Sequence, residues 1–130
     1  MKIIGIVGSS KIPFNSKSEK FIYDILHKLK NKWETVIVTG DATGVDAITR
    51  TLCLKYNLQH SVIYSKLDKF EGGYKQRNKI IADYCDEIIS IALPVSKTPC
   101  YHCNSETHER TGGCYTGKLN GNYKVLVMQL

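Results

Sequence analysis

Residues 34–56 read ETVIVTGDATGVDAITRTLCLKY, and this stretch decides the fold that the sequence predicts. Residues 34–39 are rich in β-branched side chains and stop at Gly40, as a short buried strand does. Residues 45–56 then repeat apolar side chains at the spacing of one helical face. A buried strand that passes through a glycine-containing loop into a helix is typical of a parallel α/β sheet.

The same alternation of strand and helix continues along the whole chain. The expected strands are residues 2–8, 34–39, 60–64, 86–92 and 122–128, and the expected helices are residues 17–31, 45–56, 74–84 and 113–120. Ser16 or Ser18 is the expected cap of the first helix. We therefore predict one α/β domain over residues 1–130, with a three-layer Rossmann-like fold, a mostly parallel five-stranded sheet and helices on both faces. Residues 93–114 are expected to form an irregular loop rich in Cys and His.

Composition narrows the class of protein. The 130 residues are 42% hydrophobic and 23% charged, which excludes a disordered chain, and their formal net charge of +6 is compatible with an anionic partner. The longest apolar runs are far shorter than a membrane span requires. The odd count of 5 cysteines and the lack of a secretory leader predict reduced thiols and a cytoplasmic location.

Four loops rich in Gly, Ser and Thr follow or precede the predicted elements. They are residues 8–10, residues 39–46, residues 72–78 and residues 111–116. Because ligands of parallel sheets bind at the carboxyl ends of the strands, these loops indicate a site at one edge. Glycines let backbone N–H groups converge on an anion, and a helix N-terminus favours negative charge, so the expected ligand group is a phosphate. The alternative for any single loop is ordinary turn chemistry.

The motifs Gly40-Asp41-Ala42-Thr43-Gly44-Val45-Asp46, Gly72-Gly73-Tyr74-Lys75-Gln76-Arg77-Asn78, Ala82-Asp83 and Thr111-Gly112-Gly113 occur in this order. This ordered set resembles the SLOG superfamily of Rossmann-like nucleotide-binding domains. That superfamily includes lysine-decarboxylase-like phosphoribohydrolases and the DNA-processing proteins of natural transformation. The resemblance implies that the chain binds or senses a nucleotide or a nucleotide derivative. The implied ligand-binding residues are Gly8, Ser9, Ser10, Gly40, Asp41, Thr43, Gly44, Asp46, Arg77, Asn78, Thr111, Gly112, Gly113 and Thr116.

The sequence also departs from the superfamily pattern. The small members usually carry Gly-Gly or Ser-Gly with an Arg before Gly-Val-Asp, whereas Asp41 and Thr43 stand in that stretch here. Asp41 would repel a phosphate, so it either meets a ribose hydroxyl or points away. The hydrolase branch carries a Glu after its glycine-rich loop, and that Glu is missing here. Asp46 or Glu106 would have to replace it. Binding is therefore favoured over the alternative activity, an N-glycosidic hydrolase acting on nucleoside monophosphates.

Two residues of this set have competing interpretations. Asp46 lies in the first turn of a predicted helix, where a carboxylate can cap the exposed N–H groups, or it contacts the ligand. Arg77 offers a guanidinium fork to a phosphate, or it forms an ion pair with Asp41, Asp46 or Asp83.

A separate cluster has the spacing of a metal site. Cys100 and Cys103 form a Cys-x2-Cys pair, and His108 and Cys114 follow at distances that complete a tetrahedral set. The predicted cofactor is a structural zinc that clips the loop in place. His102 is a competing ligand, and a Cys100–Cys103 disulfide is an alternative. Cys53 and Cys85 are predicted to be core residues.

A third interpretation is the binding of single-stranded nucleic acid. Tyrosines would stack on bases and lysines would follow the phosphates; the candidates are Tyr74, Tyr101, Tyr115, Tyr123, Lys66, Lys69, Lys75, Lys79 and Lys97. The tyrosines are alternatively the rim of the core. A homodimer is a further possible partner arrangement.

Overall fold

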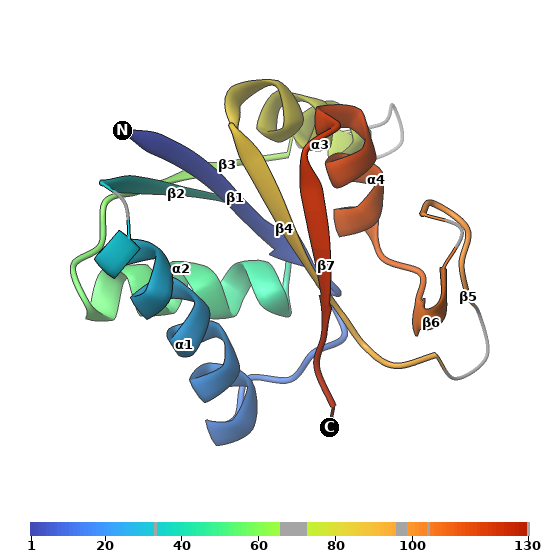
Figure 1. Cartoon of the computed structure of the whole chain (residues 1–130), viewed down its shortest axis with the longest axis horizontal. Helices are drawn as coiled ribbons and strands as arrows, with labels where there is room; N and C mark the ends of the chain where they lie inside the picture. The colour runs from blue at the N-terminus through green and yellow to red at the C-terminus, as the bar shows by residue number, and fades with distance from the viewer. Residues whose placement is uncertain (33, 66–72, 96–98, 104, 130) are drawn as a thin grey trace.

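A five-stranded parallel sheet forms the centre of the protein (Figure 1). The computed structural model describes residues 1–32, 34–65, 73–95, 99–103 and 105–129. The strands are β1 (Lys2–Gly8), β2 (Thr35–Gly40), β3 (His60–Ile63), β4 (Glu87–Ala92) and β7 (Tyr123–Val127), in the order β3-β2-β1-β4-β7. All neighbouring pairs in this sheet are parallel, so the predicted α/β architecture is confirmed.

Helices cover both faces of the sheet and make three layers. The four helices of the described chain are α1 (Ser16–Lys32), α2 (Val45–Lys55), α3 (Gly73–Tyr84) and α4 (Gly112–Asn120). Helices α1 and α2 lie on one side of the sheet, and α3 and α4 lie on the other (Figure 1). Ile22 and Leu26 of α1 share a buried cluster with Ile48 of α2, whereas Ile81 of α3 packs in a second cluster with Val38 of the sheet. The strands read as apolar runs because they are buried from both sides.

The first helix begins differently from the prediction. Asn15 is the cap, because its Oδ1 accepts hydrogen bonds at 3.0 Å from the backbone N–H groups of Lys17 and Ser18. Ser18 is buried, and its Oγ accepts a hydrogen bond from the Asn15 backbone N–H at 3.0 Å. This reciprocal pair is a capping box, and Ser18 supplies its second half rather than the cap itself.

The stretch predicted to be irregular contains a two-stranded ribbon. Strands β5 (Pro99–Cys100) and β6 (Ser105–Glu109) pair antiparallel, and an isolated bridge joins Pro94 to His108. The backbone N–H of Glu109 also donates to the Leu93 carbonyl at 2.9 Å. The prediction missed these strands because the sequence SETHE lacks the apolar alternation that marks a half-buried strand.

Close backbone packing brings the start of α4 against the end of β1. A Cβ added to Gly113 would lie 2.5 Å from Ser90 Oγ and 2.9 Å from Gly8 Cα. No larger residue fits without displacing the helix or the strand. The glycine-rich segment therefore positions the N-terminus of α4 at the carboxyl edge of the sheet.

Among the described residues, no helix combines the length and apolar character that crossing a membrane requires.

We predict that Gly113→Ala lowers the free energy of unfolding by about 1–3 kcal/mol, because the added methyl group meets backbone and a buried hydroxyl. Gly112→Ala is the matched control, since a Cβ there meets only Asn78 Nδ2 at 3.8 Å. The control should be neutral or stabilising, because Ala favours a helix more than Gly does. Urea unfolding of both variants measures the difference, and equal stabilities would contradict the packing argument.

Candidate functional site

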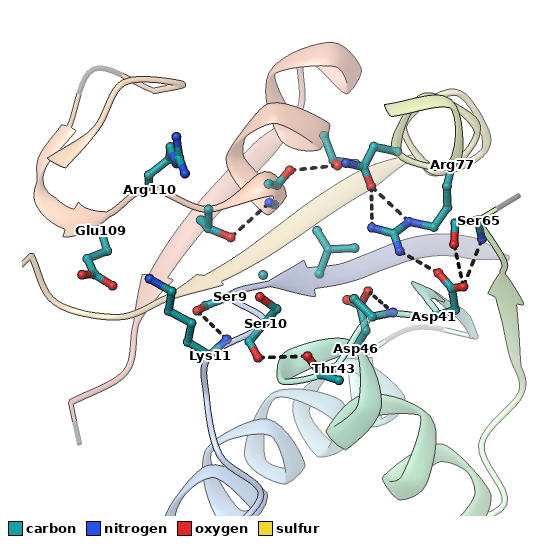
Figure 2. A pocket seen from close by; sticks show the side chains of 18 residues that line it. Ser9, Ser10, Lys11, Asp41, Thr43, Asp46, Ser65, Arg77, Glu109 and Arg110 are labelled. Atoms are coloured by element: carbon teal, nitrogen blue, oxygen red, sulfur yellow. Dashed lines mark hydrogen bonds and ion pairs between the residues drawn. The ribbon is translucent and has the colours of Figure 1, made fainter. Parts of the chain in front are cut away.

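A cleft of about 690 Å³ opens at the carboxyl edge of the sheet (Figure 2). The loop after β1, the loop after β2, the start of α3 and the start of α4 form its walls. Twelve of the fourteen residues expected to bind a ligand line it: Gly8, Ser9, Ser10, Asp41, Thr43, Asp46, Arg77, Asn78, Thr111, Gly112, Gly113 and Thr116. The cleft thus gathers residues from four loops that are far apart in the sequence.

Gly40 and Gly44 are the two expected residues that do not line the cleft. Gly44 has a φ of 70°, and a Cβ there would collide with the Ser9 carbonyl oxygen. A Cβ on Gly40 would lie 2.6 Å from Asp46 Oδ2. Both glycines act through close approach, because they let the loop after β2 pack against its neighbours.

The structure adds residues that the sequence analysis did not select. Val7, Lys11, Ala42, Ser65, Glu109 and Arg110 also line the cleft. Figure 2 shows Lys11, Glu109 and Arg110 on one side of the cleft and Arg77 on the other side. The sequence could have pointed to the two basic residues only because each is next to a predicted site residue: Lys11 follows Ser10, and Arg110 precedes Thr111.

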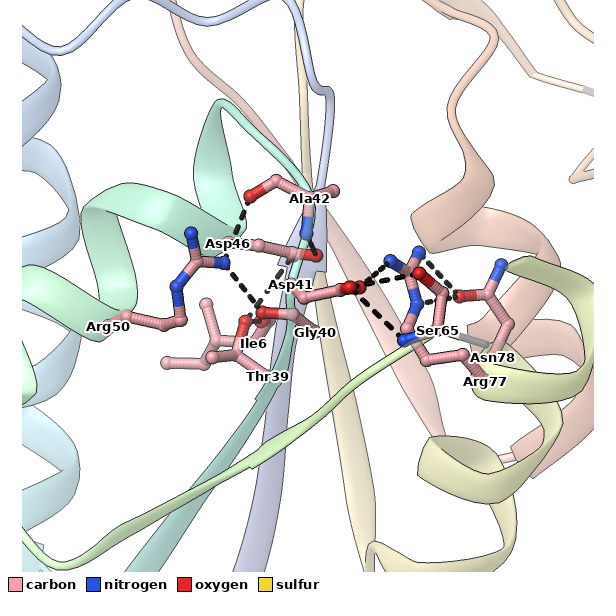
Figure 3. Close-up of polar contacts among 10 residues, drawn as sticks. All are labelled: Ile6, Thr39, Gly40, Asp41, Ala42, Asp46, Arg50, Ser65, Arg77 and Asn78. Carbon is pink, nitrogen blue, oxygen red and sulfur yellow. Dashed lines mark hydrogen bonds and ion pairs between the residues drawn. The ribbon is translucent and has the colours of Figure 1, made fainter. Parts of the chain in front are cut away.

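An ion pair between Arg77 and Asp41 organises the second side of the cleft (Figure 3). Arg77 is buried, and its Nη1 donates to Asp41 Oδ1 at 2.6 Å. Its Nε and Nη2 donate to Asn78 Oδ1 at 3.3 and 3.1 Å. Of the three possible acidic partners, the structure pairs Arg77 with Asp41. The guanidinium fork therefore holds the wall of the cleft together.

Asp41 also receives hydrogen bonds from Ser65. The Ser65 backbone N–H and Oγ donate to Asp41 Oδ2 at 3.1 and 2.9 Å. Burial opposes ionisation of this carboxyl, but the hydrogen bonds from Arg77 and Ser65 outweigh it and hold its pKa below the ordinary value. The carboxylate that would repel a phosphate is thus turned towards its own donors.

Asp46 is a buried carboxyl that faces the same cleft. Only 4% of the residue is exposed, and burial raises its pKa to about 6 although the positive charge of Arg77 opposes the shift. Thr39 Oγ1 and the Ala42 backbone N–H donate to it, both at 3.3 Å (Figure 3). The cap residue of α2 is Gly44 with no side-chain cap hydrogen bond, so Asp46 braces the preceding loop instead of capping the helix.

Several predicted hydroxyl donors already have partners within the protein. Thr43 Oγ1 donates to the Ser10 carbonyl at 3.1 Å, and Thr116 Oγ1 donates to the Gly112 carbonyl at 3.1 Å. Thr111 caps α4, because its Oγ1 accepts a hydrogen bond from the Gly113 backbone N–H at 3.2 Å. These hydrogen bonds fix the shape of the loops, so other groups would have to donate to the oxygens of a ligand.

The expected metal ligands converge beside the cleft. One ligand atom from each of Cys100, Cys103, His108 and Cys114 lies within 4.8 Å of all the others. His108 Nε2 is 3.1 Å from Cys103 Sγ and 3.8 Å from Cys114 Sγ. Ligands around one tetrahedral zinc ion lie about 3.5–3.8 Å apart, so these four residues can hold one metal ion.

The groups around the cluster suit metal binding. His108 Nδ1 lies 2.7 Å from the Glu109 carbonyl oxygen, a contact that leaves Nε2 directed at the thiols. Burial opposes ionisation of Cys100, yet hydrogen bonds from backbone N–H groups, including those of Cys103 and Thr111, hold its pKa below the ordinary value. Burial raises the pKa of Cys114. A bound metal would displace the thiol protons.

Two alternatives for the cluster are settled by the geometry. His102 is outside the four-residue set, and its ring packs instead against Tyr101 at 4.2 Å and Tyr115 at 5.6 Å between centroids. Cys100 and Cys103 are free thiols, so the disulfide alternative is not realised. Cys53 and Cys85 are buried in the core as predicted.

The residues proposed for base stacking are divided between surface and core. Tyr101 is 60% exposed, and the Arg110 guanidinium lies 5.5 Å from its ring centroid. Tyr123 packs against the core cluster of α3. Gly72, Lys66, Lys69 and Lys97 lie outside the described residues, as do the side chains of Tyr74 and Glu106.

We predict that Asp46 makes the protein less stable as the pH rises from about 4 to about 6. The folded state holds this proton more tightly than the unfolded chain, whose carboxyl has a pKa near 3.8, so unfolding becomes easier once the proton is lost. The effect is on the order of 2–3 kcal/mol. Asp46→Asn should therefore gain stability relative to wild type between pH 4.5 and 7 in urea unfolding. A constant difference between the two proteins would contradict the raised pKa.

We predict that Cys103→Ser abolishes tight metal binding, because a serine hydroxyl is a poor substitute for a thiolate ligand. His102→Gln is the matched control, one residue away and outside the cluster, and it should retain one metal ion per chain. Native mass spectrometry of the freshly purified proteins measures the occupancy. Loss of metal in His102→Gln together with its retention in Cys103→Ser would contradict the prediction, because His102 and not Cys103 would then be a metal ligand.

We compared the chain with protein-family models, curated proteins and solved structures. No family model matches the sequence, and neither a curated protein nor a solved structure matches the chain.

Proposed function

We propose that this protein binds a nucleotide or a nucleotide derivative in the cleft, with its phosphate on the side of Lys11 and Arg110. The observation that carries the proposal is that these two cations lie on one side of a cleft at the carboxyl edge of a parallel sheet and outnumber the acid that lies beside them, Glu109 (Figure 2). Phosphates bind in this position in open α/β sheets, where cationic side chains and helix N-termini favour negative charge. The cleft volume of about 690 Å³ falls within the usual range for small-molecule sites.

The distribution of charge in the cleft supports one orientation of the ligand. On the side of Arg77, the negative charge of Asp41 is already paired with the guanidinium. That side suits the uncharged and hydroxyl-bearing part of a nucleotide. The opposite side carries Lys11 and Arg110 with Glu109 beside them, so its formal charge remains positive, and we assign the phosphate to it (Figure 2). The start of α4 borders the Arg77 side, because Gly112 lies near Asn78.

Membership of the SLOG superfamily is part of the same proposal. Its support is the ordered set of motifs together with the parallel strand order. Residues of three of these motifs, among them Asp46, Arg77 and Gly113, line the cleft, whereas Ala82-Asp83 lie at the other end of α3. Thr111-Gly112-Gly113 then corresponds to the glycine-rich phosphate loop of that superfamily. Asp41 departs from the pattern of the small members, and its carboxylate is paired with Arg77, so it would not repel the phosphate directly.

We infer that the metal is zinc and that its role is structural. Three thiolates and one imidazole form a soft donor set that favours zinc. Cys100, His108 and Cys114 are buried, and four protein ligands leave no open coordination position for a substrate. When bound, zinc would supply a cross-link between the β5–β6 ribbon and α4.

The test is isothermal titration of the zinc-loaded protein with adenosine and guanosine 5′-monophosphates, with the unphosphorylated nucleosides as ligand controls. Arg110→Ala should weaken nucleotide affinity about five- to thirty-fold, because one charged hydrogen bond to a phosphate is lost. Lys118→Ala removes an equal charge from the exposed end of α4, outside the cleft, and should leave affinity unchanged. Equal binding of nucleosides and nucleotides would remove the phosphate from the proposal.

The properties of Asp46 favour a second candidate function, an N-glycosidic hydrolase, which the same titration tests. A buried carboxyl whose pKa is raised to about 6 is suited to donate a proton near neutral pH. In N-glycosidic hydrolysis it would protonate the departing base nitrogen as the bond between that nitrogen and the anomeric carbon breaks. Water would bond to the anomeric carbon, and the proton that it releases would restore the Asp46 carboxyl. Release of free base during the titration, with loss of that release in Asp46→Asn, would assign the enzyme activity in place of simple binding.

A further inference from the structure

The metal cluster and the cleft share one continuous segment of chain. Five consecutive residues that line the cleft, 109–113, lie between the metal-ligand residues His108 and Cys114. This segment contains Arg110, which the proposed function assigns to the phosphate, and the cap and first turn of α4. Any metal held by the cluster would therefore bind both ends of the segment at once.

Direct hydrogen bonds connect the metal ligands to this segment. The backbone N–H of Thr111 donates to the Cys100 sulfur, and His108 Nδ1 lies 2.7 Å from the Glu109 carbonyl oxygen. The backbone N–H of Cys114 donates to the Thr111 carbonyl at 3.2 Å. A change in the position of the thiols or the imidazole would consequently displace the backbone that lines the cleft.

The ribbon buries few apolar side chains among its described residues. Strand β5 has two residues, and the buried side chains within the described part of the ribbon are Cys100 and His108, which belong to the cluster itself. Backbone hydrogen bonding to Leu93 and the bridge to Pro94 anchor one end. A ribbon of this size lacks the apolar burial that would offset the entropy of ordering it, whereas a metal supplies that free energy.

We propose that metal and phosphate-bearing ligand bind cooperatively, so that metal occupancy controls the affinity of the cleft. The metal orders residues 109–113, and a ligand that binds the ordered segment no longer has to order it. By linkage, the ligand raises the affinity for the metal by the same factor. The choice of ligand rests on the proposed function, whereas the ordering of the segment by the metal does not.

The first experiment compares zinc-loaded and chelator-treated protein, with adenosine 5′-monophosphate as the probe in isothermal titration. Removal of zinc should weaken binding by about 5- to 150-fold, the usual range for coupled sites. A competing chelator should report a matching rise in zinc affinity when the nucleotide is present. Equal nucleotide affinity with and without zinc would overturn the linkage and leave nucleotide binding intact.

The second experiment measures amide hydrogen exchange of both forms in the absence of any nucleotide. Residues 109–113 should lose protection without zinc, while Ile4 and Ile6 of β1 stay protected because the core cluster that holds them contains none of the four metal-ligand residues. Unchanged protection of residues 109–113 would overturn the proposal even if the nucleotide had failed to bind. Failure of nucleotide binding to the zinc-loaded form, with zinc-dependent protection present, would count against the proposed function and not against the linkage.

Variants separate metal loss from chelator effects. Cys103→Ser should reproduce the exchange pattern and weak binding of the chelated protein, and His102→Gln should behave as zinc-loaded wild type. If Cys103→Ser fails to fold, the comparison of chelated and zinc-loaded wild type still decides the question. Zinc-loaded behaviour of a metal-free Cys103→Ser protein would contradict the proposal.

Discussion

Parallel pairing of β1 with both β2 and β4 is the constraint on which the cleft depends. Because these three strands run in the same direction, their carboxyl ends reach the same edge of the sheet, and the loops that follow them meet there. The chain then returns through α4, whose Gly113 fits against Gly8 with no space for a side chain. A different strand direction at any of these positions would send its loop to the opposite edge and divide the site.

Asp41 and Asp46 lie in the same cleft but in different electrostatic surroundings, because Arg77 forms an ion pair with Asp41. Arg77 pairs with Asp41 and orders Asn78, so the acid stays charged without facing the opposite wall. Asp46, buried and without such a direct ion pair, keeps its proton to a higher pH. Two aspartates five residues apart thus differ in pKa because one has strong donors and the other is mainly desolvated. Lys11, Glu109 and Arg110 lie on the other side of the cleft (Figure 2).

The four candidate metal ligands connect the β5–β6 ribbon to the rest of the fold. The ribbon of β5 and β6 lies beyond α4 at the edge of the molecule (Figure 1), and none of its described residues belongs to either core cluster. Its cysteines and histidine reach Cys114 on α4 and so connect the ribbon to the helix that starts at the cleft. Stability of this region and the geometry of the proposed phosphate site are therefore expected to depend on the same four ligands.

The sequence by itself determined the five strands of the central sheet, the four helices and the parallel α/β class. It did so because the burial of strands on two faces and of helices on one leaves an apolar pattern that can be recognised. It also predicted a Cys and His cluster that could hold a metal, because its members lie near one another in the chain, but the structure decided for His108 over His102. Only the tertiary structure decided that Arg77 pairs with Asp41, that Lys11 and Arg110 share one side of the cleft, and that residues 99–109 form a ribbon. Those outcomes depend on contacts between segments distant in sequence, and on backbone hydrogen bonds that leave no apolar periodicity behind.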